Sequence, residues 1–435
     1  MVSGAVGGDA GAQHAPASRV WTRREVLGAV VAASGLAVLG GPAELLATGE
    51  QDLRIGLVVP GGAAGEALER GAVLGAEEAA RTAELLRRTF ELVTIRAADR
   101  EEVEEAVRRL VTERGVYAIV GGADAASFAA LSEAAELHGV LFLNAWCADP
   151  VVRDAHCRGH TVHVAASTAM YVDAVAQWAA GEAGLRRWCF VGAATPSSTA
   201  VYERARRALE AQGGEAVGRV EVDAGTNDFA SVLRSVERTG ADLVFVDLAG
   251  EERRRFLEHY SAATPAFEVT GLAPEDPAEL AEGGSGPRVG VWPTMWHHTL
   301  SRFGATQLNE RYYDRFGLEM DALGWAGWFA VKVAWEAVNR ASTTAGSELV
   351  RFLESGRATF DGHKGRRLSF RPWDHQLRQI IYLVKPATDR DGAGWEVVAE
   401  LPRIPRGQTA ASQELLDRLG DSEAESRCRL EPVSS

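Results

Sequence analysis

The sequence predicts an α/β protein made of two doubly wound parallel-sheet lobes with a ligand cleft between them. Three observations carry this prediction. Short apolar segments alternate with amphipathic helical segments, which is the pattern of a parallel sheet with right-handed crossovers. The alternation runs through residues 54–143 and begins again over residues 168–260. The chain has 435 residues, which leaves room for two or three domains of ordinary size.

The first run begins with a buried strand over residues 54–60 that ends in a Gly-rich loop. The helical segment after it carries Ala residues between larger apolar ones, which favours close helix packing. We expect further strands at 90–95, 116–120 and 140–143, and helices at 64–86, 101–113 and 125–137. These elements together make one doubly wound lobe.

The second run repeats the alternation at a similar length. We expect strands at 188–192, 217–222 and 243–246, and helices at 168–181, 198–212, 229–238 and 251–260. Beyond Val289 the pattern changes to long helices at 308–316 and 322–340 and a hairpin of 368–370 with 379–384. These late elements are expected to cover and link the lobes.

The expected boundaries follow from this order. The first lobe comprises residues 52–165 with about 294–365, and the second comprises 166–293 with about 366–400. Residues from 403 to 435 are polar and rich in Glu and Ser, so we expect a loosely held tail.

The composition is that of a globular protein, with 46% hydrophobic and 24% charged residues. Acidic residues outnumber basic ones by 60 to 46, for a formal charge of −14. The hydrophobic content and the charge balance together exclude disorder of the bulk of the chain. The acidic excess also argues against a nucleic-acid partner, because such a face needs clustered basic side chains.

The N-terminal residues predict export. Arg23 and Arg24 precede an uncharged apolar stretch over 26–39, which is too short for a confident membrane-spanning helix but suits a signal-peptide core. The arginine pair resembles a twin-arginine signal, with cleavage after Ala47. We therefore predict a signal peptide over 1–47, a periplasmic or otherwise exported protein, and no membrane span after cleavage. The alternative is a cytoplasmic protein with an Ala-rich N-terminal helix.

Four cysteines occur in the chain. An oxidising compartment permits a disulfide, and Cys147 with Cys157 would close a short loop. The sequence leaves open whether this bond forms. Cys189 lies in an apolar strand pattern and is interpreted as a reduced core residue.

The residues offer little catalytic chemistry, so we expect neither an enzyme nor a bound cofactor. The Gly-x-Ser-x-Gly, His-Glu-x-x-His, Walker and complete dinucleotide patterns do not occur in the sequence. The cluster of His and Cys over 156–163 could suggest zinc or copper. In a strand, however, His160 and His163 point to opposite faces, so we predict no metal site.

Ligands of open α/β sheets bind at the carboxyl ends of the strands. In the first lobe the loops at these ends are 60–65, 121–127 and 144–147, and in the second they are 193–198 and 247–250. The loop 121–127 opens a helix, and its free amides offer an anion site. Two such lobes facing each other form a clamp that can close by hinge motion.

A likeness to a known family lies in six segments of the sequence, namely 55–60, 71–78, 118–122, 143–145, 308–317 and 371–379. These segments resemble the type I periplasmic binding proteins, in the leucine/isoleucine/valine-binding branch of ABC transporter substrate-binding proteins. The likeness spans roughly residues 52–386, and segment 371–379 looks like a subgroup that accompanies quinone-dependent alcohol dehydrogenase systems.

The resemblance implies three crossings between the lobes and a small-molecule ligand that is delivered to an ABC permease in the membrane. Amino-acid binders of this family grip the ligand carboxylate with Ser or Thr after the third and fourth strands. Asp124 and Trp146 stand near those positions here, and Ser127 is displaced. An Asp would repel a carboxylate, so we predict a ligand other than an ordinary aliphatic amino acid, namely an uncharged, aromatic or cationic molecule.

The predicted ligand-binding residues come from the loops of both lobes. Trp292 and Trp296 are further candidates, with core packing as their alternative. The predicted set is Asp124, Ala125, Ser127, Asn144, Trp146, Thr195, Ser197 and Asp247.

Two other functions stay open at this point. The same clamp could report its ligand to a membrane receptor or regulator. A metal-dependent enzyme in the cleft is the third possibility, and it depends on the Cys and His cluster as a metal site.

Overall fold

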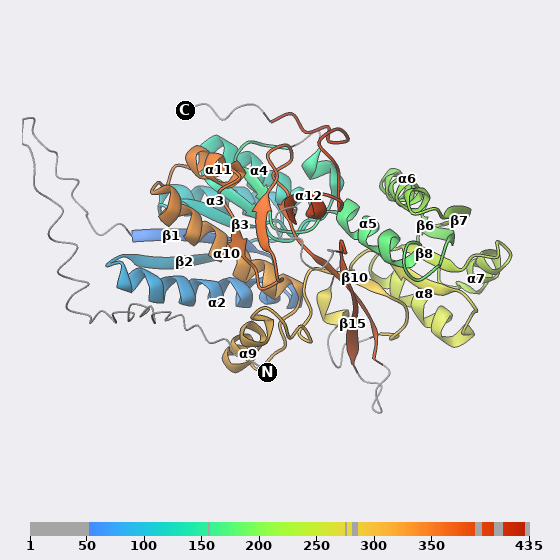
Figure 1. Ribbon diagram of the computed structural model, residues 1–435. Coiled ribbons are helices and arrows are strands. Elements are labelled where there is room, and N and C mark those ends of the chain that lie inside the picture. Colours follow the sequence, from blue (N-terminus) through green and yellow to red (C-terminus); the bar gives the residue numbers. More distant parts are fainter. Residues whose placement is uncertain are drawn as a thin grey trace, which may run out of the picture. The chain divides into compact units, whose positions relative to one another are not determined.

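The computed structural model describes residues 52–154, 157–274, 276–280, 286–387, 394–403 and 412–430 (Figure 1). The predicted signal peptide over 1–47 lies outside the described residues. From residue 50 onward the chain forms one compact unit. Within this unit two parallel sheets are present, as the sequence predicts.

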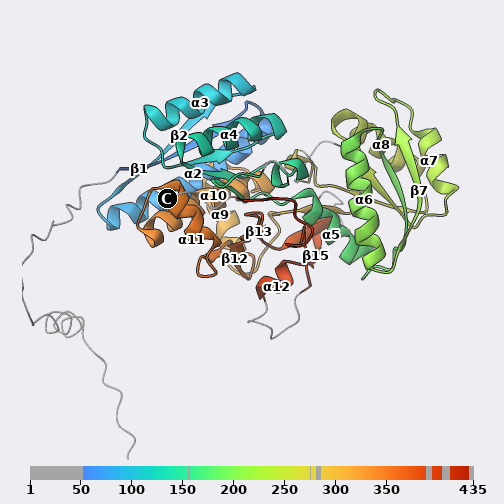
Figure 2. The same cartoon turned by 90° about the horizontal axis from the view of Figure 1, so that it is seen from above.

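The first sheet has the strand order β2-β1-β3-β4-β5, and all of its neighbouring strands are parallel. Its central strands are apolar because helices cover both faces. Helices α3 and α4 lie on one face, and α2 and α10 lie on the other (Figure 2). The elements are β1 (Asp52–Val59), α2 (Ala63–Leu85), β2 (Thr89–Arg96), α3 (Arg100–Thr112), β3 (Ala118–Gly121), α4 (Ala125–His138), β4 (Leu141–Asn144), β5 (Thr161–His163) and α10 (Ala322–Ala341).

Helices α2 and α10 pack backbone against backbone. A Cβ atom on Gly71 would lie 1.8 Å from the carbonyl oxygen of Gly324, and one on Gly327 would lie 2.2 Å from that of Leu68. Glycine at these positions allows an approach that any side chain would block. The late helix α10 is thereby fixed to the first lobe, where its first turn borders the ligand cavity described below.

The second sheet has the order β7-β6-β8-β9 and is also parallel. The side chains of α5 and α6 pack on one face, and those of α7 and α8 pack on the other. The elements are α5 (Thr168–Ala179), β6 (Arg187–Ala193), α6 (Pro196–Ala211), β7 (Glu215–Val222), α7 (Ala230–Glu237), β8 (Leu243–Asp247), α8 (Gly250–Ala263) and β9 (Glu268–Gly271).

Antiparallel elements connect the two lobes. Strand β14 (Ile381–Pro386) lies between β10 (Trp292–Thr294) and β15 (Trp395–Leu401). The chain passes between the lobes at 164–167, which we call the first crossing, again at 295–304, and again at 379–380. Further late elements are η1 (Pro150–Arg153), η2 (Pro277–Leu280), α9 (Ala305–Phe316), α11 (Gly346–Glu354), β11 (Phe360–Asp361), β12 (Arg367–Phe370) and β13 (Leu377–Arg378).

The expected hairpin of 368–370 with 379–384 is wrong in its pairing. Strand β12 pairs instead with β13, and β14 joins β10 and β15. The turn between β12 and β13 lies against the first lobe, where His375 contacts the carbonyl oxygen of Thr161 (2.8 Å). Strands β12 and β13 therefore pair with each other, and β14 belongs to the three-stranded sheet with β10 and β15.

The expectation of a loose tail is wrong for residues 412–430, which we call the strap. The strap begins with α12 (Ser412–Leu416), and both Leu416 and Leu419 are fully buried. The carboxylate of Asp417 accepts hydrogen bonds from the guanidinium groups of Arg371 (2.9 Å) and Arg378 (2.8 Å). Apolar burial and charge-assisted hydrogen bonds thus hold the strap to the β12–β13 hairpin.

The strap also contacts the second lobe. Arg204 of α6 pairs with Asp421 of the strap (2.6 Å) and with Asp173 of α5 (2.5 Å). The amide of Gly420 donates to Asp173 (2.7 Å). One C-terminal segment therefore bridges both lobes at the side of α5 and α6.

A disulfide joins Cys157 to Cys428 of the strap. The alternative pairing of Cys147 with Cys157 is wrong, because Cys147 is a free, buried thiol. Cys189 is free and fully buried in the second lobe, as its strand pattern predicts. The sequence cannot show the observed pairing, because its partners are 271 residues apart.

Among the described residues, no helix combines the length and the apolar character needed to cross a membrane.

Candidate ligand-binding site

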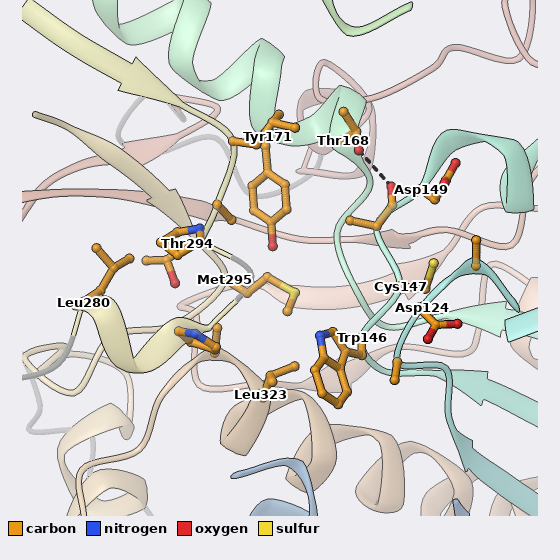
Figure 3. A pocket seen from close by; sticks show the side chains of 18 of the residues that line it. Asp124, Trp146, Cys147, Asp149, Thr168, Tyr171, Leu280, Thr294, Met295 and Leu323 are labelled. Atoms are coloured by element: carbon orange, nitrogen blue, oxygen red, sulfur yellow. Dashed lines mark hydrogen bonds between the residues drawn. The ribbon is translucent and has the colours of Figure 1, made fainter. Parts of the chain in front are cut away.

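A cavity of about 600 Å³ lies where the carboxyl ends of the two sheets meet. Its walls come from loops after β1, β3 and β4, from the first turns of α5 and α10, from β10, and from the chain after β9 (Figure 3). The described lining residues are Pro60, Ala123, Asp124, Ala125, Trp146, Cys147, Ala148, Asp149, Thr168, Tyr171, Leu272, Ala273, Pro274, Pro277, Leu280, Thr294, Met295, Ala322 and Leu323.

The loop after β3 brings Asp124 to the cavity. Asp124 is the N-cap of α4, and its carboxylate accepts a hydrogen bond from the amide of Ser127 (2.7 Å). The cap satisfies one of the helix's free amides. The negative charge also occupies the helix end that the sequence suggested as an anion site, and the side chain of Asp124 remains exposed.

The segment 145–149, which we call the ligand loop, follows β4 and presents Trp146 to the cavity. The fully buried amide of Asn144 shapes this loop. Its oxygen accepts from the amides of Trp146 (3.2 Å) and Cys147 (3.0 Å), and its nitrogen donates to the carbonyl of Cys147 (2.8 Å). Asn144 thus fixes the backbone that carries Trp146, and its own side chain is not part of the cavity wall.

The other end of the ligand loop carries a second carboxylate. Asp149 caps η1 by accepting a hydrogen bond from the amide of Val151 (2.8 Å). The thiol of Cys147 lies in the same wall, and burial raises its pKa. Of the described residues around the cavity, none is Lys, Arg or His. The polar part of the first-lobe wall is therefore acidic or neutral.

Helix α5 contributes Tyr171, which is 5% exposed. Figure 3 shows its hydroxyl directed toward Met295, and Trp146 and Leu323 lie beyond Met295 as seen from Tyr171. Burial raises the pKa of Tyr171, so the phenol stays protonated and can both donate and accept. In the described part of the chain no residue hydrogen-bonds this hydroxyl.

The second lobe supplies an apolar wall to this cavity through Leu272, Pro277 and Leu280. Its predicted polar residues Thr195, Ser197 and Asp247 line a neighbouring hollow of about 260 Å³. The two hollows share Leu272 and Ala273. The hydroxyl of Thr195 caps α6 by accepting from the amide of Ser198 (3.2 Å).

Burial raises the pKa of Asp247, and the hydroxyl of Ser198 partly offsets this rise by hydrogen bonding to the carboxylate. Asp247 is half-buried at the end of β8. A buried carboxylate gains most from a cationic or hydrogen-bond-donating partner. Asp247 therefore adds a carboxylate to the second hollow, which Glu252, Arg253 and Glu279 also line.

The structure therefore divides the predicted site residues. Asp124, Ala125 and Trp146 line the main cavity, and Thr195, Ser197 and Asp247 line the second hollow. Ser127 and Asn144 are buried supports of the loops and line neither hollow.

The additional tryptophan candidates are core residues. Trp296 stacks on Trp325 with ring centroids 6.0 Å apart, and its indole donates to Asn309 (2.9 Å). Trp292 is 1% exposed and lies under the guanidinium of Arg253, 4.3 Å from its ring centroid. Both therefore follow the core-packing alternative.

Sequence reasoning missed Tyr171, Asp149 and Met295. The signal for Tyr171 was its place near the start of the helix after the first crossing, four residues after the capping residue Ser167. Met295 follows β10 at the second crossing, which no local pattern revealed. The sulfur of Met295 accepts a hydrogen bond from the amide of Ala166 (3.1 Å), so it joins two crossings at the cavity.

The His and Cys cluster does not converge on one point. His163 stacks on Phe128 in the core, with ring centroids 5.6 Å apart, whereas His160 faces Glu136 (3.1 Å). In the part of the chain that the structure describes, no group of His, Cys, Asp and Glu side chains could hold a metal ion.

Asp321, the N-cap of α10, makes the stability of the cavity floor pH-dependent. Burial and the charge of Asp276 raise its pKa from 3.8 to about 6, against the opposing effects of Arg70 and the amide of Gly324. The folded state thus binds this proton more tightly than the unfolded state, and stability falls as pH rises from about 4 through 6.

Asp321→Asn keeps the cap and removes this titration. We expect wild-type protein to lose about 1–3 kcal/mol relative to the variant between pH 4 and pH 7. Urea unfolding at several pH values measures this difference. If the free energies of unfolding of the two proteins change with pH in parallel, the carboxyl group does not titrate in this range.

Comparisons with known proteins agree with this architecture. The family model described as "Periplasmic binding protein" matches residues 53–392. A search of curated proteins found no match. Among solved structures, a branched-chain amino acid ABC transporter ligand-binding protein from Burkholderia xenovorans has a TM-score of 0.75 at 19% identity, covering 87% of this chain and 99% of its own.

Two further structures show the range of ligands on this fold. The leucine-, isoleucine-, valine-, threonine- and alanine-binding protein from Brucella ovis has a TM-score of 0.74 at 15% identity, covering 88% of this chain and 99% of its own. A solute-binding protein from Rhodopseudomonas palustris, solved with 3,4-dihydroxybenzoic acid, has a TM-score of 0.67 at 15% identity, with 82% and 99% covered. At these identities the likeness concerns the fold.

Proposed function

Because the chain belongs to the periplasmic binding protein family, we propose that it captures a small molecule in the interlobe cavity and delivers it to the permease of an ABC importer. The observation that supports this most is the cavity of about 600 Å³, which both lobes line. Such a volume suits a small organic ligand. The family consists of binding proteins, so the site requires no catalytic group.

We infer that the main cavity and the second hollow are the two halves of one ligand site. They meet at Leu272 and Ala273, and hinge closure would bring their polar groups to the same ligand. Trp146 would stack on the ligand from the first lobe, and Tyr171 would offer its hydroxyl beside the hinge. Asp247 would contribute a carboxylate from the second lobe.

The ligand that fits this wall has an aromatic body and no carboxylate. In the main cavity a carboxylate would face Asp124 and Asp149, and the described residues that line this cavity include no Arg, Lys or His. The second hollow has Arg253, but its guanidinium already pairs with Glu279 (2.5 Å). An amine or a hydroxyl could instead donate hydrogen bonds to these carboxylates. Neutral or cationic aromatic molecules therefore suit the cavity better than leucine or benzoate.

The exported location and its route belong to this proposal as well. Residues 1–47 would direct export as a twin-arginine signal, and the mature chain would meet its permease outside the cytoplasm. The narrower resemblance of segment 371–379 to a subgroup associated with quinone-dependent alcohol dehydrogenases stays a prediction.

A thermal-shift screen tests the ligand class. Benzylamine and benzyl alcohol represent the expected classes, and leucine and benzoate represent the excluded ones. A ligand at 100 times its Kd should add about 2.7 kcal/mol of stability. Tight binding of leucine or benzoate in calorimetric titration would refute the proposed ligand class, while leaving the binding function intact.

The charge of Asp124 provides a sharper test. Asp124→Asn preserves the cap of α4, because Asn is as good an N-cap as Asp. We expect the variant to bind benzylamine about three- to tenfold more weakly, as for a partly exposed charge pair, and to bind benzyl alcohol unchanged. Titration calorimetry of both proteins with both compounds measures this. Equal effects on the two compounds would exclude a charge contribution from Asp124.

A further inference from the structure

Two buried glutamines contact the first crossing, Gln376 from the turn between β12 and β13 and Gln379 from the third crossing. The amide nitrogen of Gln376 donates to the carbonyl of Ala165 (2.9 Å), and that of Gln379 donates to the carbonyl of Val164 (2.8 Å). Gln376 is 1% exposed and Gln379 is fully buried. Two of the three connections between the lobes are thereby joined side by side.

Each glutamine oxygen accepts from a buried basic side chain. Arg153 donates through Nε to Gln376 (2.8 Å), and Lys364 donates through Nζ to Gln379 (2.7 Å). Arg153 is 6% exposed and Lys364 is 3% exposed. The two arrangements are chemically alike, because in each a basic side chain donates to a glutamine amide, which in turn donates to a backbone carbonyl.

The two basic side chains differ in their other contacts. Arg153 donates to the carbonyls of Cys147 (2.9 Å), Asp149 (3.1 Å) and Ala165 (3.0 Å). Lys364 donates to the carbonyl of Ile380 (3.0 Å) and lies 3.8 Å from the ring centroid of Trp325. Only the arginine of this pair therefore touches the ligand loop.

We propose that Arg153, held by Gln376, is a positioning residue that locks the ligand loop to the hinge. This rests on the proposed function in one respect, namely that the ligand loop with Trp146 is the first-lobe wall of the binding site. The forked guanidinium binds the loop at two carbonyls and the first crossing at a third. The loop and the hinge therefore move as one body when the lobes close, and Trp146 keeps its place.

The physical reason is the strength of charge-assisted hydrogen bonds in a buried setting. A hydrogen bond to a charged group contributes more than a neutral one, and a lysine cannot span the same acceptors. Loss of the guanidinium leaves the carbonyls of Cys147 and Asp149 without this donor. The ligand loop then opens locally while the rest of the lobe stays folded.

Alkylation of Cys147 by iodoacetamide tests this without a ligand. Cys147 is a free, buried thiol on the ligand loop, and Cys189 is a free, buried thiol in the second-lobe core. Peptide mass spectrometry gives the labelling rate of each thiol. The rate at Cys147 is then divided by the rate at Cys189, because global unfolding exposes both thiols whereas local opening of the ligand loop exposes Cys147. The full chain with its disulfide intact is used.

We expect Arg153→Lys to raise this ratio about tenfold or more, since removal of charged hydrogen bonds shifts local opening by that factor. Gln376→Leu, which removes the acceptor of Arg153 Nε, should raise it less, and it decides the question if Arg153→Lys fails to fold. Lys364→Met is the matched control, because it removes the other buried basic side chain that donates to a glutamine and leaves the ligand loop's contacts in place.

An unchanged ratio in both test variants, or an equal rise in Lys364→Met, overturns the positioning role. Because the ratio needs no bound compound, it stays informative if every screened ligand fails to bind. Conversely, a raised ratio with unaltered ligand affinity would refute the ligand loop as part of the site while supporting the lock.

Discussion

Replacement of Cys428 by Ser is expected to lower the free energy of unfolding by about 2–5 kcal/mol. The bond between Cys157 and Cys428 closes a loop across a sequence separation of 271 residues, so its loss enlarges the conformational freedom of the unfolded chain greatly. Guanidinium chloride unfolding without reductant measures the change. Reduced wild-type protein should then match the variant.

The same substitution should loosen the strap in the folded state. The strap would still keep its buried leucines and its hydrogen bonds to Arg371, but its far end near Arg427 would lose the covalent anchor. Hydrogen exchange should therefore increase over 421–430 more than over α12. Cys157→Ser and the double variant should reproduce the single variant, because each removes the same bond. Unequal single variants would point to a thiol-specific effect instead.

Replacement of Trp146 by Ala is expected to weaken ligand binding about a hundredfold. The ligand to be used is the aromatic compound that gives the largest thermal shift in the screen. Truncation of a large aromatic side chain that anchors a ligand in a desolvated pocket costs about 2–4 kcal/mol of binding free energy. Trp146 projects from the ligand loop into the cavity, where it lies opposite Tyr171 (Figure 3). Titration calorimetry with that compound measures the loss.

Two controls separate stacking from general damage. Trp146→Phe retains a ring and should lose less affinity than Trp146→Ala. Trp178, a half-buried residue of α5, is not among the residues that line the cavity, so Trp178→Ala should leave the affinity unchanged. An affinity that is unaltered in Trp146→Ala would exclude this tryptophan from the site.

The repeating elements were predictable because their signals are local. Alternation of apolar strands with amphipathic helices needs only neighbouring residues, and the helix predicted at 125–137 is observed as α4 (Ala125–His138). The strand predicted at 243–246 is likewise β8 (Leu243–Asp247). The strand pairing beyond Val289 was harder to predict, because the two partners of β14 lie on either side of it in the chain.

The site was predictable in part. The rule that ligands bind at the carboxyl ends of parallel strands brought Asp124 and Trp146 into consideration, and both line the cavity. The same rule could not reveal Tyr171 or Met295, because Tyr171 follows the first crossing and Met295 begins the second, and the position of both crossings depends on both lobes. It also included Asn144, whose polar side chain is used to hold the loop backbone.

The sequence by itself determined the two-lobed α/β architecture and the loops that could reach a ligand, since the apolar periodicity of each strand and helix is encoded within a short stretch. Only the tertiary structure decided which loop residues face the cavity, that the C-terminal segment is a strap, and that Cys157 pairs with Cys428. The physical reason is that these features depend on contacts between residues hundreds of positions apart. Such contacts form only when the lobes and the late segment pack together.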